Sequence, residues 1–501
     1  MPFGQPDDKI AEVMILRQEE TAVDHREKKC VSALQNWIVG FCLLLTLAPI
    51  LASFTVRPFY YLFQGDIGQG RCTVLELGEY WGNIVYFLGA CLLVCTVLGA
   101  GKRYSGHLGC LREKGWLSRH WLPCCLLCLL LWSVLSFCFA DDKMAGLWGA
   151  HLCQEGLILF SYYGAIFLAC SWLTGKQRRL LCESLVLTGA FTGILLILGG
   201  NPTVQRIFYI EYPETVMFHQ YNHYGYFLAV CAPLSLGLLL ETDARRKGLW
   251  LWRLLQLWLI FNAMAFNSTR GSFLAVALEI LCLHIYVFTC RKEKKLTLLL
   301  LDLPVGATFL FLNTGSILLD RLGLMLKELL GFASAPDKEE ALNQLGTERG
   351  MLWRYGLEIV KKRPLLGFGP GNMMEQFRPY MKRPSSPHND LILMAGSLGI
   401  PAVIFYVLGL LGHLRGFFSI AKKLSILEVS IFGAVLSYLI SASLGVSMYL
   451  LLSTSSQVTS TSFHWPSIFT MFQAWGPPSS LPHLPMPSTT MTSMPPCCRR
   501  Y

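Results

Sequence analysis

The sequence predicts an all-α polytopic membrane protein with about 11–12 transmembrane helices and one large extracytoplasmic loop. Of its 501 residues, 53% are hydrophobic and only 15% are charged. Soluble domains carry about 25% charged residues, so this composition is typical of a chain that is solvated largely by lipid. The apolar residues also form continuous runs, whereas the strands of a membrane barrel would alternate. Each run is therefore predicted to be a helix, which satisfies its own backbone polar groups without water.

Eleven apolar runs have lengths close to the roughly 20 residues that cross a bilayer as a helix. They are 34–56, 83–101, 120–140, 155–175, 180–199, 225–241, 249–266, 272–290, 296–314, 391–414 and 424–452. A weaker twelfth candidate covers 463–475.

These runs divide the chain into five segments. They are a cytoplasmic segment (1–33), transmembrane helices 1–9 (34–314), a large outer loop (315–390), the C-terminal transmembrane helices (391–475) and a Pro/Ser-rich tail (476–501). The tail holds seven prolines in its 26 residues, a composition that builds neither a helix nor a core. We expect it to be either disordered or the product of a shifted reading frame.

The distribution of Lys and Arg predicts the orientation. With a cytoplasmic N-terminus, the inner segments hold 23 Lys and Arg residues and the short outer segments hold five. Positive residues favour the cytoplasmic side, so the loop at 315–390 and the turn at 267–271 are predicted outside. The first 33 residues lack the apolar core of a cleavable signal peptide. Because the net charge of +10 is spread over small clusters, we interpret it as a topology signal and expect no nucleic-acid partner.

The large loop has predicted structure of its own. Apolar residues repeat at three- and four-residue spacing from Leu318 to Phe332, which indicates a helix lying at the membrane interface. A second helix is predicted from Asp337 to Lys362, ending before Pro364. The glycine-rich stretch at 365–371 then predicts a turn in which glycines permit positive φ and close approach of a ligand.

Several residues on the predicted outer face are candidates for chemistry. They are Arg270, Arg349, Arg354 and His388, with Arg206, His219 and His223 around them. Each has a simpler interpretation, since an arginine at a span end reaches lipid headgroups and a loop histidine is often solvated. Together they suit a diphosphate, whose oxygens a guanidinium binds bidentately, and a histidine that takes a proton near neutral pH. At this depth a diphosphate would belong to a lipid carrier.

Metal ligands and disulfides are harder to assign. His219 and His223 have the four-residue spacing of a helical metal pair, but further ligands are not apparent and we expect no metal. Cys72 and Cys153 both fall in predicted outer loops and are either paired or free. Most other cysteines lie in apolar runs, where a thiol behaves as a small hydrophobic group.

Three stretches resemble the O-antigen ligase and Wzy-type polymerase superfamily. They are FHQYNHYGYFLAV (218–230), AFNSTRGSFLAV (265–276), and ERGMLWRYGLEIVKKRPLLGFGPGN (348–372) followed by PHNDLILMAGSLGIP (387–401). The similarity covers about 218–406, and the order and spacing of the three stretches make it specific. The chain departs from the family after about Leu452, where a further span or two would follow.

The resemblance extends to single residues. The arginine after the Ser/Thr of the family's TRG-like turn corresponds to Arg270. The arginine four residues before the tryptophan that precedes the PLLGxG turn corresponds to Arg349, with Trp353 as the tryptophan. The His-Asn pair that opens the next span corresponds to His388 and Asn389.

The resemblance implies a C-type membrane glycosyltransferase of the bacterial cytoplasmic membrane. It would transfer a glycan from undecaprenyl diphosphate to a lipid- or glycan-linked acceptor at the outer face, among membrane lipids, with no metal or nucleotide-sugar cofactor. Arg270 and Arg349 would neutralise the leaving diphosphate, and His388 would orient or deprotonate the acceptor hydroxyl. The expected substrate-binding residues are Arg354, Arg206, Asn222, Asn389, Gly369 and Gly371. Activity is expected provided that the C-terminus is intact.

Two alternatives remain open. Ligation to an acceptor and polymerisation of repeat units are not separated by these residues, although the loop and the PHND stretch are more similar to ligases. A transporter or flippase without covalent chemistry would need charges buried inside the spans. The charged residues in or near the spans are Arg253, Glu183, Glu279 and Asp302, which we expect near span ends or facing the bundle.

Overall fold

The computed structural model describes residues 32–47, 50–51, 87–100, 121–149, 156–208, 216, 221–313, 317–382 and 384–443. Helices account for the regular structure of these residues, which contain no β-strand, and the predicted all-α polytopic fold is confirmed. Several features predicted from the sequence lie outside the described residues. They are nearly all of the segment 1–33, Cys72, Cys153, His219, the weak span at 463–475 and the tail.

Each of the eleven predicted runs overlaps a helix. In chain order the helices are Ser32–Leu47, Phe87–Ala100, α4 (Trp121–Cys138), α5 (Lys143–Trp148), α6 (Leu157–Ser171), α7 (Gly175–Leu198), α8 (Pro202–Phe208), α9 (Tyr221–Glu241), α10 (Lys247–Asn267), α11 (Arg270–Cys290), α12 (Lys295–Asn313), α13 (Ile317–Ser334), α14 (Lys338–Lys362), α15 (Arg378–Met381), α16 (Asp390–Leu398), α17 (Ile400–Ile420) and α18 (Ile426–Ser443). Six helical segments among the described residues are long and apolar enough to cross a membrane: α4, α7, α9, α10, α11 and the segment that contains α17.

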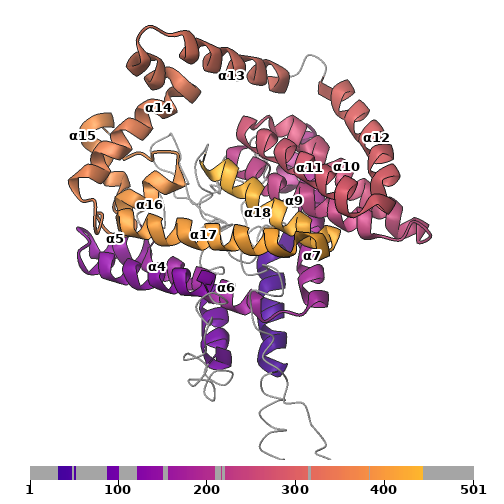
Figure 1. Cartoon of the computed structure of the whole chain (residues 1–501), viewed down its shortest axis with the longest axis horizontal. Helices are drawn as coiled ribbons and strands as arrows, with labels where there is room; N and C mark the ends of the chain where they lie inside the picture. The colour runs from indigo at the N-terminus through magenta and orange to yellow at the C-terminus, as the bar shows by residue number, and fades with distance from the viewer. Residues whose placement is uncertain are drawn as a thin grey trace, which may run out of the picture.

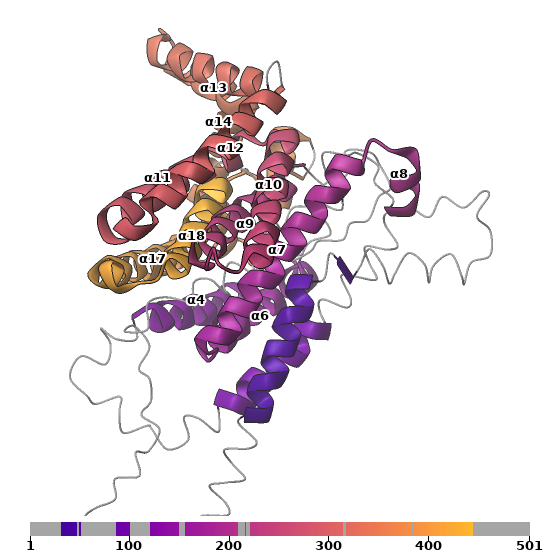
Figure 2. The same cartoon turned by 90° about the vertical axis from the view of Figure 1, so that its right-hand side faces the viewer.

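Helix α9 forms the centre of the bundle (Figure 2). Every residue from 223 to 240 is buried, so α9 is surrounded by protein on all sides and not only along one face. It packs against α7, α10, α11 and α18. In contrast, α11 and α17 leave leucine and isoleucine side chains such as Leu281 and Leu411 more than half exposed. A helix with such an outer face is suited to contact with lipid tails.

A second group of helices, α4, α6 and α17, flanks this centre (Figure 1). Tryptophans of α4 attach it to α17 and α16 through their indole groups. Trp121 Nε1 donates to the Leu408 carbonyl at 2.8 Å, and Trp132 Nε1 donates to the Leu398 carbonyl at 2.9 Å. These bonds fix the side of α17 that faces α4.

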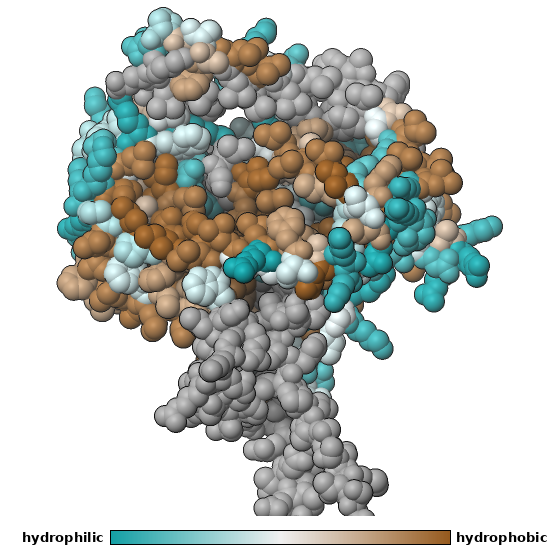
Figure 3. Space-filling view, viewed as in Figure 1, coloured by the Kyte–Doolittle hydropathy of each residue, from teal (hydrophilic) through white to brown (hydrophobic). Residues whose placement is uncertain are grey.

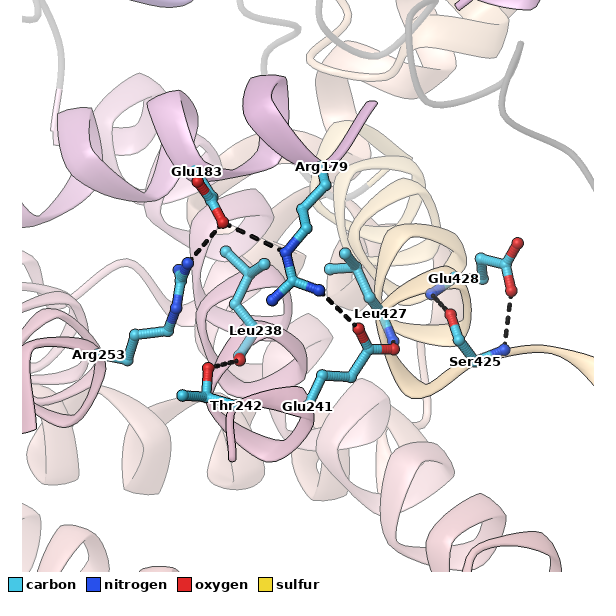
Figure 4. A network of polar contacts seen from close by, with 9 residues as sticks. All are labelled: Arg179, Glu183, Leu238, Glu241, Thr242, Arg253, Ser425, Leu427 and Glu428. Carbon is cyan, nitrogen blue, oxygen red and sulfur yellow. Dashed lines mark hydrogen bonds and ion pairs between the residues drawn. The ribbon is translucent and has the colours of Figure 1, made fainter. Parts of the chain in front are cut away.

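Charged side chains join the ends of α7, α9, α10 and α18 on one side of the bundle (Figure 4). Glu183 accepts from Arg253 at 2.6 Å and pairs with Arg179 at 3.3 Å. Arg179 also pairs with Glu241 at 3.2 Å, and Glu241 accepts from the Leu427 backbone at 2.9 Å. The Lys/Arg pattern assigns all four of these helix ends to the cytoplasmic side.

The other two charged residues noted in the spans are also internal or paired. Asp302 of α12 accepts from His284 of α11 at 2.8 Å between the Nε2 and Oδ2 atoms. Glu279 lies in the middle of α11, is buried, and faces Gly433 of α18. Glu279 therefore faces the bundle, whereas Asp302 is an exposed residue of α12 that is paired with His284.

The predicted single span at 391–414 is wrong, because the structure divides this run into α16 and α17 at Gly399. Gly399 has φ +90° and donates to the Ala395 carbonyl, which ends α16. Ile400 then donates to the Pro364 carbonyl at 2.8 Å as α17 begins. The apolar residues on both sides of Gly399 conceal this break, since α16 buries its apolar face against protein and not against lipid.

Replacing Gly399 with alanine should therefore destabilise the protein. The added Cβ would overlap the Leu365 carbonyl, and an L-residue in this backbone conformation, φ +90° and ψ 166°, costs about 1–3 kcal/mol before any overlap. Thermal unfolding of the detergent-solubilised protein, followed by size-exclusion chromatography, measures the effect. Gly416→Ala, at a helical position of α17 with open space around it, is the control and should leave the melting temperature unchanged or higher. Equal melting temperatures for the two variants would contradict this account of the turn.

Candidate functional site

Helices α13 and α14 occupy the large loop and begin and end within a few residues of the predicted helices. Helix α14 packs against α16, and a buried apolar cluster joins them to the segment between. The cluster consists of Leu352, Ile359, Phe368, Met373, Met374, Phe377 and Leu393. This cluster packs α14, α16 and the residues between them into a unit of its own next to the bundle. We call this unit, together with α13, the outer segment, after the outer loop predicted from the sequence.

The glycine-rich turn is held by backbone hydrogen bonds to the end of α16. Phe368 N donates to the Gly396 carbonyl and Gly369 N donates to the Ser397 carbonyl, both at 2.9 Å. Gly369 has φ +99°, and a Cβ there would overlap Ala140 at the end of α4. The Gly369 amide is therefore already paired within the protein, and the glycine allows close approach of α4.

Side chains fix the same turn to the start of α5. Asn372 donates through Nδ2 to the carbonyls of Pro370 at 2.8 Å and Asp142 at 3.2 Å, and its Oδ1 accepts from Asp142 N at 3.0 Å. Arg363 forms an ion pair with Asp141 at 2.7 Å. The loop is thus attached to α4 and α5 as well as to α16.

One face of α14 approaches the loop that precedes α16. Arg349, Trp353 and Gly356 are spaced four and three residues apart and share this face. A Cβ at Gly356 would lie 2.7 Å from the Ile392 side chain and 3.2 Å from Pro387 Cβ, so the helix and the loop are in close contact there. On this face Arg349 lies close enough to His388 for its charge to act on the histidine.

His388 is held in an unusual environment. Its backbone has φ +52°, and its N–H donates to Ser386 Oγ at 3.3 Å. The ring Nδ1 is buried and has no hydrogen-bond partner among the described residues. Burial, and secondly the nearby charge of Arg349, lower the pKa of His388 to about 4. The imidazole is therefore neutral at physiological pH.

The turn that carries Arg270 is docked on the first residue of α9. Asn267 Nδ2 donates to the Tyr221 carbonyl at 2.7 Å, and Thr269 Oγ1 donates to the same carbonyl at 3.2 Å. Between them Ser268 takes a left-handed conformation with φ +57°. This approach requires Gly225, because a Cβ there would lie 2.6 Å from both Asn267 Oδ1 and Thr269 Oγ1.

Arg270 begins α11 and contacts the outer segment through α13. Its Nη1 lies 3.6 Å from Glu328 Oε1, and both side chains are partly buried. Helix α13 continues into α14, the helix that carries Arg349. The candidate site thus has two parts, Arg270 on the bundle and the Arg349–His388 pair on the outer segment.

The remaining predicted residues have varied positions. Arg354 lies over the Tyr355 ring at 5.5 Å, and Asn222 is partly buried in the first turn of α9. Asn389 caps α16 through its Oδ1, which accepts from Ile392 N at 3.1 Å. Arg206 falls on α8, where its side chain is not described, and Gly371 lies in the buried turn with φ +68°.

Sequence reasoning missed Gly225, Asn372 and Glu328. Gly225 stands inside the quoted stretch 218–230, and its place one helical turn after Tyr221 signals close packing at this end of α9. Asn372 directly follows the glycine-rich turn, where asparagine often bonds the backbone. Glu328 has no comparable signal, since a glutamate on an interfacial helix is usually solvated.

The fold and these positions define a polytopic helical membrane protein with Arg349 and His388 on a compact segment beside the apolar bundle and Arg270 at the end of a bundle helix. Comparison with known families agrees: the Wzy_C family model, described as O-antigen ligase, matches residues 255–407. The chain thus carries an O-antigen ligase domain that includes Arg270, Arg349 and His388, which confirms the resemblance to this superfamily. A search of curated proteins gave no match. In the part of the chain that the structure describes, no three His, Cys, Asp or Glu side chains are grouped to hold a metal ion.

Gly225→Ala should impair the site without preventing membrane insertion. The new Cβ would push the turn at 267–269 away from α9 and displace the guanidinium of Arg270. Transfer activity, measured beside the amount of monodisperse protein, should fall at least tenfold, since small misplacements of binding groups carry large rate costs. Gly248→Ala, which has open space around the added methyl group, is the matched control. Full activity of the Gly225 variant would show that the docking of the turn does not position Arg270.

Proposed function

We propose that this protein is a membrane glycosyltransferase of the O-antigen ligase type. It transfers a glycan from undecaprenyl diphosphate to a lipid- or glycan-linked acceptor at the outer face of a bacterial cytoplasmic membrane. The family match supports the class of protein, and the pairing of Arg349 with a neutral, mostly buried His388 is the observation that carries the chemistry.

The reaction needs a base and a sink for negative charge. The acceptor hydroxyl oxygen attacks the anomeric carbon while the bond from that carbon to the diphosphate oxygen breaks, and the configuration inverts. The hydroxyl proton passes to the neutral imidazole of His388, and the departing diphosphate gains one negative charge. Arg349 and Arg270 stabilise this charge through guanidinium hydrogen bonds to phosphate oxygens.

Arg349 also links donor binding to the basicity of His388. Burial opposes protonation of the imidazole, and the positive charge of Arg349 adds to this effect. A bound diphosphate neutralises that charge, so the pKa of His388 rises when the donor is in place. The histidine is therefore a stronger base in the donor complex than in the free protein.

The other predicted residues support this arrangement. Arg354 and Asn222 extend the polar surface on the two parts of the site, and Arg206 belongs to the same outer region. Asn389 positions His388 by capping α16, and Gly369 and Gly371 shape the turn that carries the α14–α16 contact. Their proposed contribution to binding is therefore through the shape of the site.

Reconstitution tests the reaction directly. Purified protein in liposomes receives an undecaprenyl-diphosphate glycan and an acceptor glycolipid. We expect a single capped acceptor, with and without a chelator. A ladder of lengths would instead assign repeat-unit polymerisation, and movement of the carrier without a new glycosidic bond would assign a flippase. Loss of the product with chelator would overturn the proposed independence from metal.

Arg270→Ala and Arg349→Ala should each lower the transfer rate by about 10²–10³, the usual cost of removing one donor to a developing anion. Both variants should insert and purify as the wild type does. Arg245→Ala is the control, because Arg245 is an exposed arginine between α9 and α10, on the side of the bundle away from the Arg270 turn. Wild-type rates in either site variant would refute the assigned diphosphate contact.

The pH dependence should report His388. In kcat/KM, which reflects the free enzyme, activity should persist as the pH is lowered and fall only near pH 4. In kcat the fall should come at higher pH, because the bound diphosphate neutralises Arg349. The free energy of unfolding should also fall as the pH is lowered. The unfolded histidine takes up a proton near pH 6.5 and the folded one does not, so stability declines as the pH falls from 6.5 to 4. Identical profiles for kcat and kcat/KM would contradict the coupling.

A further inference from the structure

Helix α13 is the least embedded part of the site. Figure 1 shows it as an arch that connects α12 with α14 above the bundle, and Figure 3 shows an opening beneath the arch. Leu324, Leu326 and Leu330 of α13 are more than half exposed. Its neighbours are α12 and α14 near its ends and α11. Among the described side chains of α13, Glu328 is the one with an ion pair to the bundle.

The ion pair between Glu328 and Arg270 is one of these contacts. It joins the second half of α13 to the first residue of α11. At 3.6 Å the two atoms are farther apart than the 2.7–2.9 Å of a close charged hydrogen bond. Partly exposed pairs of this kind contribute about 0.2–1 kcal/mol, so a stronger anion can replace the carboxylate.

The carboxylate of Glu328 faces the guanidinium of Arg270, the group proposed to bind the diphosphate. A planar carboxylate and a tetrahedral phosphate both offer oxygens that accept hydrogen bonds from a guanidinium. A diphosphate carries more negative charge than a single carboxylate and offers more oxygens. The donor and Glu328 consequently compete for Arg270, and the donor has the advantage.

A break in the chain separates α13 from α14. Pro336 interrupts the chain between α13 and α14, and Asp337 Oδ1 accepts from Glu340 N at 3.2 Å to start the next helix. The exposed leucines of α13 suit the membrane interface, so a shift along that surface need not expose new apolar area to water.

We propose that Glu328 closes the α13 arch over Arg270 and that the diphosphate of the lipid donor opens it by displacing the carboxylate. The arch is then an autoinhibitory gate, in which Glu328 holds Arg270 until a donor binds. This inference rests on the proposed function in one respect, the role of Arg270 as a diphosphate ligand.

Binding of undecaprenyl diphosphate to purified protein in nanodiscs tests the competition. Glu328→Gln removes the charge and keeps the shape of the side chain, and we expect it to lower the Kd about two- to fivefold. The gain should shrink at high salt, which screens the pair in the wild type. Asp320→Asn, an exposed carboxylate on the same helix, is the control and should leave the Kd unchanged. Inorganic pyrophosphate as a second probe separates the headgroup from the lipid tail, and the same gain is expected for both.

The two hypotheses fail in different ways. If Arg270→Gln abolishes binding while Glu328→Gln leaves the Kd as in the wild type, the gate is refuted and the diphosphate site stands. If Arg270→Gln binds the lipid as the wild type does, the proposed site itself fails.

Hydrogen exchange of the peptides at 317–334 tests the movement independently. Undecaprenyl diphosphate should raise exchange in α13 of the wild type, and Glu328→Gln should show raised exchange without ligand. The charge-reversed double variant Arg270→Glu with Glu328→Arg should restore protection of α13 but not binding of the lipid. Unchanged exchange in the wild type on ligand addition would overturn the gate.

Discussion

Two backbone hydrogen bonds, from Phe368 and Gly369 to the carbonyls at the end of α16, hold the outer segment in one arrangement. They join the turn after α14 to α16, the helix that follows His388. Gly369 also allows α4 to pack against this turn. The position of α14 relative to the His388 loop follows from them. Without this attachment the arginine face of α14 and the histidine would belong to two independent loops.

The electrostatics of the site follow from the same packing. Arg349 is close enough to His388 to oppose its protonation, while Arg270 is occupied by the carboxylate of Glu328. Arg349 and Arg270 therefore each act on another group of the protein. A diphosphate that binds both arginines would change both interactions at once. Donor binding would then raise the basicity of His388 and release Arg270 from Glu328.

The sequence predicted the helices of this protein well because their signals are local. Apolar run length located the spans, and Pro364 marked the end of α14. The break at Gly399 escaped, since apolar residues on both sides suit either lipid or protein as a neighbour. Among the site residues, the charge of Arg349 acts on His388, whereas the pairing of Arg270 with Glu328 depends on the path of α13. The amides of the glycine turn have partners far along the chain that no local pattern contains.

The central position of α9 has a consequence for biogenesis. At the charged helix ends, Glu241 of α9 accepts a hydrogen bond from the backbone of Leu427 in α18, which lies 186 residues later in the chain. When α9 first enters the bilayer, one flank is thus still facing lipid, including polar groups such as Ser235 that are buried in the finished bundle. The core is completed only when α18 is inserted. Correct assembly therefore depends on holding an unfinished bundle in the membrane during synthesis of the chain from α10 to α17.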